Sequence, residues 1–221
     1  MDELFAAIKG GDQTTVERIV AADPAMAGAV DADGVSALLT ALYHGNTTAA
    51  DALRATGMDL TVFEAAAVGD LRRIRELVDG DPSLVQAYAA DGFHALGLAA
   101  FFHHPEVVRF LIQAGADVSA PSRNPMRVTA LHSAVADEGD SESALALVVA
   151  GADPNAKQRH GWTPLHAAAQ TGDRAVIAAL LAAGADPTLT HDAGRRAADL
   201  AREAGHTELA ALLEHAPAAS G

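Results

Sequence analysis

Histidines are the first residues to consider for acid–base or metal chemistry in this 221-residue sequence, which has ten histidines and no cysteine. Two of them occupy equivalent places in related segments, His132 in TALHSAV and His166 in TPLHAAA. A catalytic base needs a positioned partner, and no arrangement of serine, aspartate and histidine recurs around these two. We therefore expect His132 and His166 to be structural rather than catalytic.

The adjacent residues His103 and His104 are the second candidate, as metal ligands. Neighbouring residues on a helix point in different directions, and no third ligand is spaced on the same face. The segment DEGDSE, residues 137–142, holds four carboxylates but lacks the alternating ligands and distant glutamate of a calcium loop, so it predicts a solvated turn. Without cysteine, thiolate zinc sites and cysteine nucleophiles are excluded. No phosphate-binding, nucleophile-elbow or zinc-protease motif occurs. The sequence predicts no enzyme, no cofactor and no metal.

The formal net charge is −14, from 29 acidic and 15 basic residues, and such a field repels nucleic acid and anionic lipid. Residues 1–61 carry nine acids and three bases, whereas residues 156–221 carry seven and six. Any charge-based recognition would therefore favour a basic partner at the N-terminal half, although solubility alone explains such a charge. The acidic N-terminus and the lack of an apolar run of ~20 residues lead us to expect a soluble, cytoplasmic, monomeric protein.

The sequence repeats itself. Residues 62–119 align without a gap on residues 4–61, which pairs Gly11-Asp12 with Gly69-Asp70 and Asp23-Pro24 with Asp81-Pro82. Further on, TALHSAV at 129 returns as TPLHAAA 34 residues later. A period of this size is typical of a solenoid whose units bury their apolar faces only against each other.

One unit can be read in detail from residue 161. Thr163 is a favoured N-cap and Pro164 a favoured first helical residue, with Leu165 predicted to lie in the core. Gly172 ends this short helix, and an apolar stripe over residues 176–181 predicts a second one. Each unit is therefore expected to be a helix pair preceded by a projecting turn, which we call a finger.

The elements GxTPLHxAA, GD and LLxxGADPN/T resemble those of the ankyrin repeat. The resemblance covers nearly the whole chain and implies an all-α ankyrin-repeat solenoid, a single domain over residues 1–221 of stacked helix-turn-helix pairs with projecting β-turn or hairpin loops. Seven units are expected, the first and third without the opening turn and the last a terminal cap. Their approximate ranges are 2–30, 31–61, 62–89, 90–119, 120–155, 156–188 and 189–216.

Departures from the repeat also carry predictions. The positions that close the first helices are 11, 45, 69, 103, 139, 172 and 205, so one interval is only 24 residues. About ten residues are missing there, which predicts a gap in the row of fingers near Asp59 to Glu64. His103 replaces the closing glycine, so that helix is expected to turn without its usual cap. Arg127 replaces a finger glycine, and the turn at 137–142 is expected to be irregular.

By resemblance to the ankyrin family, His132 and His166 are buried hydrogen-bonding residues, and two sets of positions face the concave side. Trp162 is expected there because the solenoid's own core does not require it, whereas Phe101 or Phe102 could instead pack inward. Aromatic and arginine side chains are enriched at binding hot spots. The residues expected to contact a partner are Val35, Tyr43, His44, Phe93, Phe101, Phe102, Val128, Arg159, His160, Trp162, Gln170 and Arg195, and Thr171 shares the position of Phe102.

Two classes of function remain open from the sequence. The favoured one is a non-catalytic module that binds a partner protein on the concave face and the fingers. The alternative is a small-molecule or metal-responsive regulator, or a cryptic enzyme, that uses the cluster from Phe101 to His104. The fold accepts unrelated ligands through surface variation, so the sequence does not identify the partner.

Overall fold

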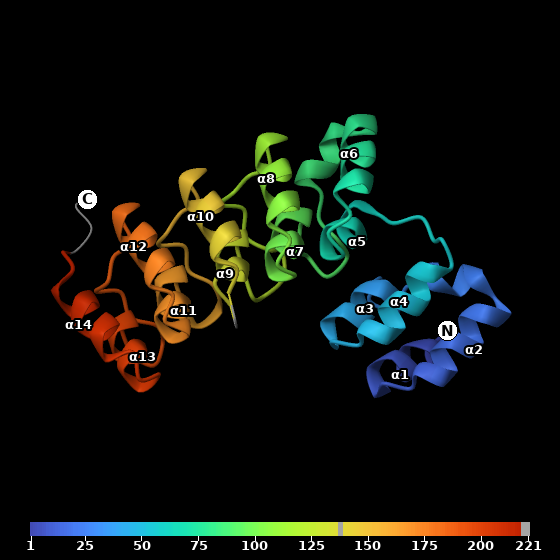
Figure 1. Cartoon of the computed structure of the whole chain (residues 1–221), viewed down its shortest axis with the longest axis horizontal. Helices are drawn as coiled ribbons and strands as arrows, with labels where there is room; N and C mark the ends of the chain where they lie inside the picture. The colour runs from blue at the N-terminus through green and yellow to red at the C-terminus, as the bar shows by residue number, and fades with distance from the viewer. Residues whose placement is uncertain (137–138, 218–221) are drawn as a thin grey trace.

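A computed structural model describes residues 1–136 and 139–217, and within them the chain is built of paired α-helices with no strand (Figure 1). Isolated bridges such as Val30 with Ser36 are the only β-type pairing in this part of the chain. The all-α, paired architecture is the one predicted. The pairs are α1 (Asp2–Gly10) with α2 (Gln13–Ala22), α3 (Ala37–Tyr43) with α4 (Thr47–Ala55), α5 (Val62–Ala67) with α6 (Leu71–Gly80), α7 (Ala95–Phe101) with α8 (Pro105–Gln113), α9 (Ala130–Ala134) with α10 (Ser141–Val149), α11 (Pro164–Thr171) with α12 (Arg174–Ala182), and α13 (Ala197–Glu203) with α14 (Thr207–His215).

Short polar side chains start most of the second helices. The carboxylate or amide oxygen of the capping residue accepts the backbone N–H three residues later, which satisfies one donor that the helix start leaves free. This explains the recurring Gly-Asp element, since the glycine ends one helix and the next residue starts the following one. The capping residues are Asp12, Asn46, Asp70, Asp140 and Asp173.

A left-handed residue lies one or two positions beyond the end of six first helices, whereas after α9 it is Gly139, five positions beyond Ala134. At the seven positions picked out by the repeat, φ is positive, from 59° at His103 to 86° at Gly205. The expectation that the helix before His103 turns without the usual cap is wrong, because His103 itself adopts the left-handed conformation. Arg127 does the same with φ 52° in place of the finger glycine. Both residues accept a backbone strain that glycine avoids.

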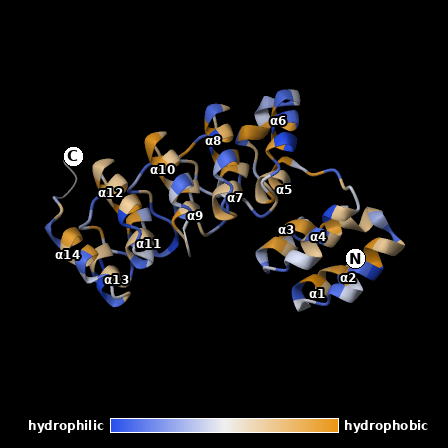
Figure 2. Cartoon of the chain, viewed as in Figure 1, coloured by the Kyte–Doolittle hydropathy of each residue, from blue (hydrophilic) through white to orange (hydrophobic). Residues whose placement is uncertain are grey.

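The helices form two rows, with first helices stacked on first helices and most second helices on second helices (Figure 1). Hydrophobic residues lie mainly in the helices, whereas hydrophilic residues occur both in the loops and in helices such as α6 (Figure 2). The core has two clusters. One fills α1 to α4, and the larger one runs from α5 to α14 and also includes Leu39 of α3. Leu42 and Leu60 pack against both clusters. None of the described helices is long and apolar enough to cross a membrane.

The missing finger changes how the units meet. Only six residues separate the end of α4 from the start of α5, so the third unit has no finger. We expected this to leave a gap in the row, and that is only partly right. The finger of the second unit (30–36) lies directly against that of the fourth (88–94), so closely that a Cβ on Gly34 would fall 2.9 Å from Ala90 Cβ. A cavity of about 270 Å³ remains beneath them, lined in part by Asp59 and Glu64.

The loops contain one feature that was not predicted, and one predicted turn can be compared with the structure only in part. Each Asp-Pro pair of the copied block begins a 3-10 helix, η1 (Pro24–Gly28) and η2 (Pro82–Gln86), which was not predicted. Asp23 and Asp81 have almost the same backbone angles, which supports the copying of one block. Of the irregular, solvated turn expected at 137–142, residues 137 and 138 lie outside the described residues, and the expectation is wrong for Ser141 and Glu142, which already belong to α10.

Gly34→Ala tests the contact between the second and fourth fingers. Alanine at this left-handed position costs roughly 1–2 kcal/mol for the backbone alone, and crowding against Ala90 adds about 1–3 kcal/mol. Gly194→Ala is the matched control, since Gly194 has φ 76° in the last finger and nothing within 4 Å of its added Cβ. Urea denaturation should show a larger loss in the free energy of unfolding for Gly34→Ala than for Gly194→Ala. Equal losses would mean that the two fingers do not press together.

Candidate binding groove

His166 is held by hydrogen bonds at both ring nitrogens. Its Nδ1 accepts from Thr163 N at 3.1 Å and lies 2.8 Å from Thr163 Oγ1, while Nε2 lies 3.2 Å from the carbonyl oxygen of Arg195. A carbonyl can only accept, so Nε2 carries the proton. His132 repeats the arrangement with Thr129 and the Trp162 carbonyl. Each ring therefore links the start of its own helix to the finger of the next unit.

These rings are neutral at pH 7. Burial lowers the pKa of the His132 imidazole to about 4, and it also lowers the pKa of His166. A neutral ring whose two nitrogens are both engaged is suited to holding the backbone rather than to proton transfer. Thr163, Pro164 and Leu165 are all buried beside His166 in the start of α11.

Two further units have their own version of this contact, which sequence reasoning missed. His94 accepts from Gly97 N at 2.9 Å and donates to the Ala120 carbonyl at 3.0 Å. In the third unit, Glu64 replaces histidine and accepts from Thr61 N and Oγ1, at 2.9 and 2.8 Å, although only 3% of Glu64 is exposed. The Thr-x-x-Glu spacing of a capping box was the signal available in the sequence.

The structure separates the residues from Phe101 to His104. His104 Nε2 donates to the Ala67 carbonyl at 3.0 Å, and its ring fills the space beside Gly69. His103 is exposed, while Phe101 faces the concave side. Across the described residues, no group of three or more potential ligands could hold a metal ion. The proposed small-molecule or metal cluster is therefore not assembled as one site.

A concave cavity of about 590 Å³ gathers half of the residues that were expected to contact a partner. Its lining is mostly apolar and comes from the second, fourth, fifth and sixth units, with Lys9 added from the first. Three of its side chains are large, apolar and partly exposed: Tyr43 at 37%, Phe101 at 40% and Met126 at 47%. We call this cavity the groove. The predicted residues that line it are Val35, Tyr43, His44, Phe93, Phe101 and Val128.

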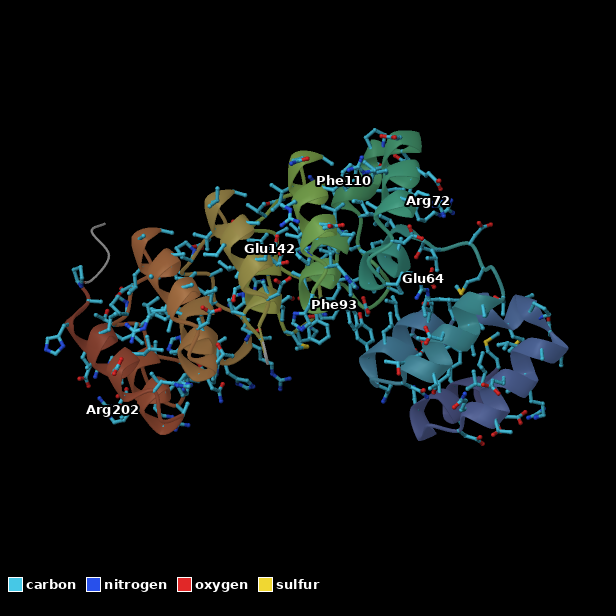
Figure 3. The ribbon with its side chains drawn as sticks, viewed as in Figure 1. Glu64, Arg72, Phe93, Phe110, Glu142 and Arg202 are labelled. Atoms are coloured by element: carbon cyan, nitrogen blue, oxygen red, sulfur yellow. The ribbon has the colours of Figure 1, made fainter. Side chains whose placement is uncertain are left out.

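Aromatic rings form one wall of the groove. The Tyr43 ring stacks on Phe102 with centroids 5.8 Å apart and lies 6.5 Å from Phe93, and Phe102 meets Phe101 edge to face at 5.0 Å. Phe102 is half-buried against the core, so of the two neighbouring phenylalanines it is the one that packs inward. Figure 3 labels Phe93, which lies on the side of the α7 unit that is nearest to α3 in Figure 1.

The Tyr43 hydroxyl donates to the Asp91 carboxylate at 2.7 Å. Burial, and then this hydrogen bond, raise the pKa of Tyr43 far above its usual range. A residue at the end of α3 is thereby fixed to the finger of the fourth unit. We call these contacts of Tyr43, together with those of Gly34 on Ala90, the Tyr43 junction.

Other predicted residues lie beyond the groove. Gln170, Thr171 and Trp162 line an adjacent hollow of about 420 Å³, which shares Ala136, Gln158 and Ala167 with the groove. Arg159 and His160 are exposed on the sixth finger, and His160 Nδ1 lies 3.6 Å from an Asp192 oxygen. Arg195 pairs with Glu203. Met126 also lines the groove and was not predicted from the sequence, although an apolar residue in a finger could have indicated it.

The role expected of Trp162 needs correction. Its ring is half-buried and stacks on His191, with centroids 5.1 Å apart and planes 15° from parallel, and it also approaches the His166 ring at 5.9 Å. Trp162 therefore packs the sixth unit against the seventh, and the solenoid does use it. Its remaining surface faces the adjacent hollow.

The sequence matches the family described as Ankyrin repeats (3 copies) over residues 62–158 and 131–219. These ranges cover more than half of the chain, and the chain belongs to the ankyrin repeat family. Membership suggests a protein-interaction module with protein partners in general.

Curated relatives share a shorter stretch. NAD-capped RNA hydrolase NUDT12 from Homo sapiens, Macaca fascicularis and Pongo abelii is 38% identical to this chain over 71 residues, which is 32% of this chain. The matched stretch spans only 15% of the length of those relatives. Such a short match does not carry their activity to this chain.

The buried histidines predict a loss of stability in acid. The pKa of His132 is about 4 in the folded chain against the usual 6.5, so the unfolded chain takes up the proton first as the pH falls. Neutral, buried His132 therefore contributes fully to the free energy of unfolding above pH 6.5, and this contribution is lost between pH 6.5 and 4. At 1.36 kcal/mol per pKa unit the loss is on the order of 3 kcal/mol. Denaturant titrations should show a smaller decline over this range in His132→Gln than in the unsubstituted chain. Parallel declines would contradict a neutral, buried His132.

Proposed function

We propose that this chain is a non-catalytic protein-binding module, and that apolar side chains of a partner protein enter the groove. The observation that carries the proposal is the gathering of Tyr43, Phe101 and Met126, three partly exposed large apolar residues, around one concave cavity. Scattered exposed apolar residues need no explanation, but a contiguous concave set is typical of a binding surface.

The groove is also prepared for binding before a partner arrives. Phe101 rests edge to face on Phe102, and Tyr43 is held by both Phe102 and Asp91. Side chains that are already fixed lose little conformational entropy on binding, so more of the contact energy appears as affinity. Rigid aromatic anchors of this kind are common among hot-spot residues.

The proposed surface extends from the groove along the array. The hollow beside Trp162 and Gln170 shares part of its lining with the groove, and Arg159 and His160 project from the finger next to it. We treat residues 1–221 as one domain, because the larger core cluster reaches back to Leu39 of α3. A partner segment could then contact several units at once.

A small molecule is the alternative occupant, since the cavity volume lies within the roughly 300–1,000 Å³ of ligand sites. That alternative used the cluster from Phe101 to His104, of which Phe101 lines the groove and the two histidines do not. The surface of the groove is mostly apolar, although polar side chains such as Thr40, Ser133 and Gln158 also line it. The proposal therefore favours a protein segment with apolar side chains.

Phe101→Ala tests the proposal with peptides selected from a random display library on the full chain. Loss of a hot-spot aromatic should weaken peptide binding by roughly tenfold or more, while the exposed position should leave the melting temperature almost unchanged. Val149→Ala is the control, because Val149 is 87% exposed on α10, away from the groove. Fluorescence anisotropy measures the affinity. Binding that is indifferent to Phe101→Ala would place the partner elsewhere.

A further inference from the structure

The basic residues of this acidic chain are not distributed evenly with respect to ion pairing. Nine of the 15 lysines and arginines have a carboxylate oxygen within 4.0 Å among the described residues. Of the other six, Lys9 and Arg75 lie on α1 and α6. The remaining four all belong to the fifth and sixth fingers (121–128 and 157–162): Arg123, Arg127, Lys157 and Arg159.

These two fingers lie side by side. Arg159 N donates to the Met126 carbonyl at 2.8 Å, and Arg123 N donates to Gly92 O of the fourth finger at the same distance. The Arg123 guanidinium lies over the Tyr88 ring, 3.9 Å from its centroid. Arg127, Lys157 and Arg159 are exposed. Backbone pairing between the fingers therefore brings exposed cations together on one part of the array.

The cations also border the groove. Arg127 stands between Met126 and Val128, which both line it, and Lys157 and Arg159 flank Gln158, which lines it as well. We call Arg127, Lys157 and Arg159 the basic rim. In the part of the chain that the structure describes, none of the three has a carboxylate within 4.0 Å. An anion that reached the groove at this end would meet charges that no carboxylate of the described residues neutralises.

The opposite end of the groove is acidic. Asp31 and Asp91 line it on the second and fourth fingers, and Asp33 is exposed beside Asp31. Lys9 of α1 is the only basic side chain in the groove lining itself. The charge of the fingers therefore changes sign along the groove, from acidic at the second unit to basic at the fifth and sixth.

We propose that the segment bound in the groove is acidic as well as apolar, and that its carboxylates lie against Arg127, Lys157 and Arg159. This proposal rests on the proposed function of the groove. Arginine forms charge-assisted, often bidentate hydrogen bonds with carboxylates. Complementary charge at a rim also steers encounter and sets the direction in which a segment binds. The acidic end of the segment would point away from Asp31 and Asp91.

This inference differs from the expectation drawn from total charge. A net charge of −14 favours a basic partner in general, but at short range the free charges next to the groove decide which groups can pair. Nucleic acid is disfavoured because its phosphates would extend along the acidic second and fourth fingers. A short acidic protein segment can contact the basic rim without reaching them.

Peptides selected from a random library on the full chain are the probe, and their affinity is measured by fluorescence anisotropy. The selected peptides should combine apolar with acidic residues. The double variant Arg127→Glu/Arg159→Glu should weaken their binding by roughly tenfold or more, with a smaller factor at high salt because ions screen exposed charges. Arg75→Glu is the matched control, an exposed cation on α6 that also lacks a carboxylate partner in the described structure. If the charge reversal lowers the melting temperature, Arg127→Gln/Arg159→Gln replaces it.

The outcomes separate this inference from the proposed function. Apolar or basic peptides that need Phe101 but are unaffected by the double variant would overturn the inference and leave the groove proposal standing. Peptides indifferent to Phe101→Ala would overturn the groove proposal itself. A labelled single-stranded oligonucleotide that binds as tightly as the peptides, and is lost in the double variant, would show a nucleic-acid site and also overturn the inference.

Discussion

The Tyr43 junction determines the shape of the concave face. The third unit has no finger, so nothing of its own separates the fingers of the second and fourth units. Tyr43 fills this position by stacking on Phe102 and donating to Asp91, while Gly34 allows the backbone to approach Ala90. The groove crosses this position, and its walls come from both sides of it. The missing finger therefore lies at the groove, whose lining is mostly apolar.

A repeated polar contact keeps the rest of the array in register. His94, His132 and His166 each join a helix start to the next finger, and Glu64 makes the local half of the contact in the third unit. Buried polar groups stabilise a fold only when they are hydrogen-bonded. Among the described side chains, His191 Nε2 is the buried polar atom without a partner, and the Trp162 ring stacks on this same imidazole. The contact between the last two units therefore relies on stacking as well as on hydrogen bonds.

The sequence predicted what depends on local chemistry. Helix pairs and the glycines that follow first helices were predicted from residue type and spacing over a few residues, as Gly172 illustrates. The aspartate caps of the second helices and the left-handed conformation of His103 were not predicted. The sequence could not predict how units settle against one another. The closure of the second finger on the fourth and the stacking of Trp162 on His191 depend on the packing of whole units, and no short pattern encodes that. Six of the residues that line the groove could be named individually from the sequence. The change of charge along the groove could not be predicted, because it depends on which fingers lie side by side.

The distance between the first units and the later ones tests the Tyr43 junction most directly. The chain has no cysteine, so spin labels can be placed at Asp51→Cys on α4 and Val149→Cys on α10, two exposed side chains. Double electron–electron resonance should give one narrow distribution of the distance between the two labels. Tyr43→Ala should broaden this distribution. The control Leu212→Ala, which changes an exposed apolar side chain on α14, should not. An unchanged, narrow distribution in Tyr43→Ala would contradict the claim that this junction holds the two sides of the groove together.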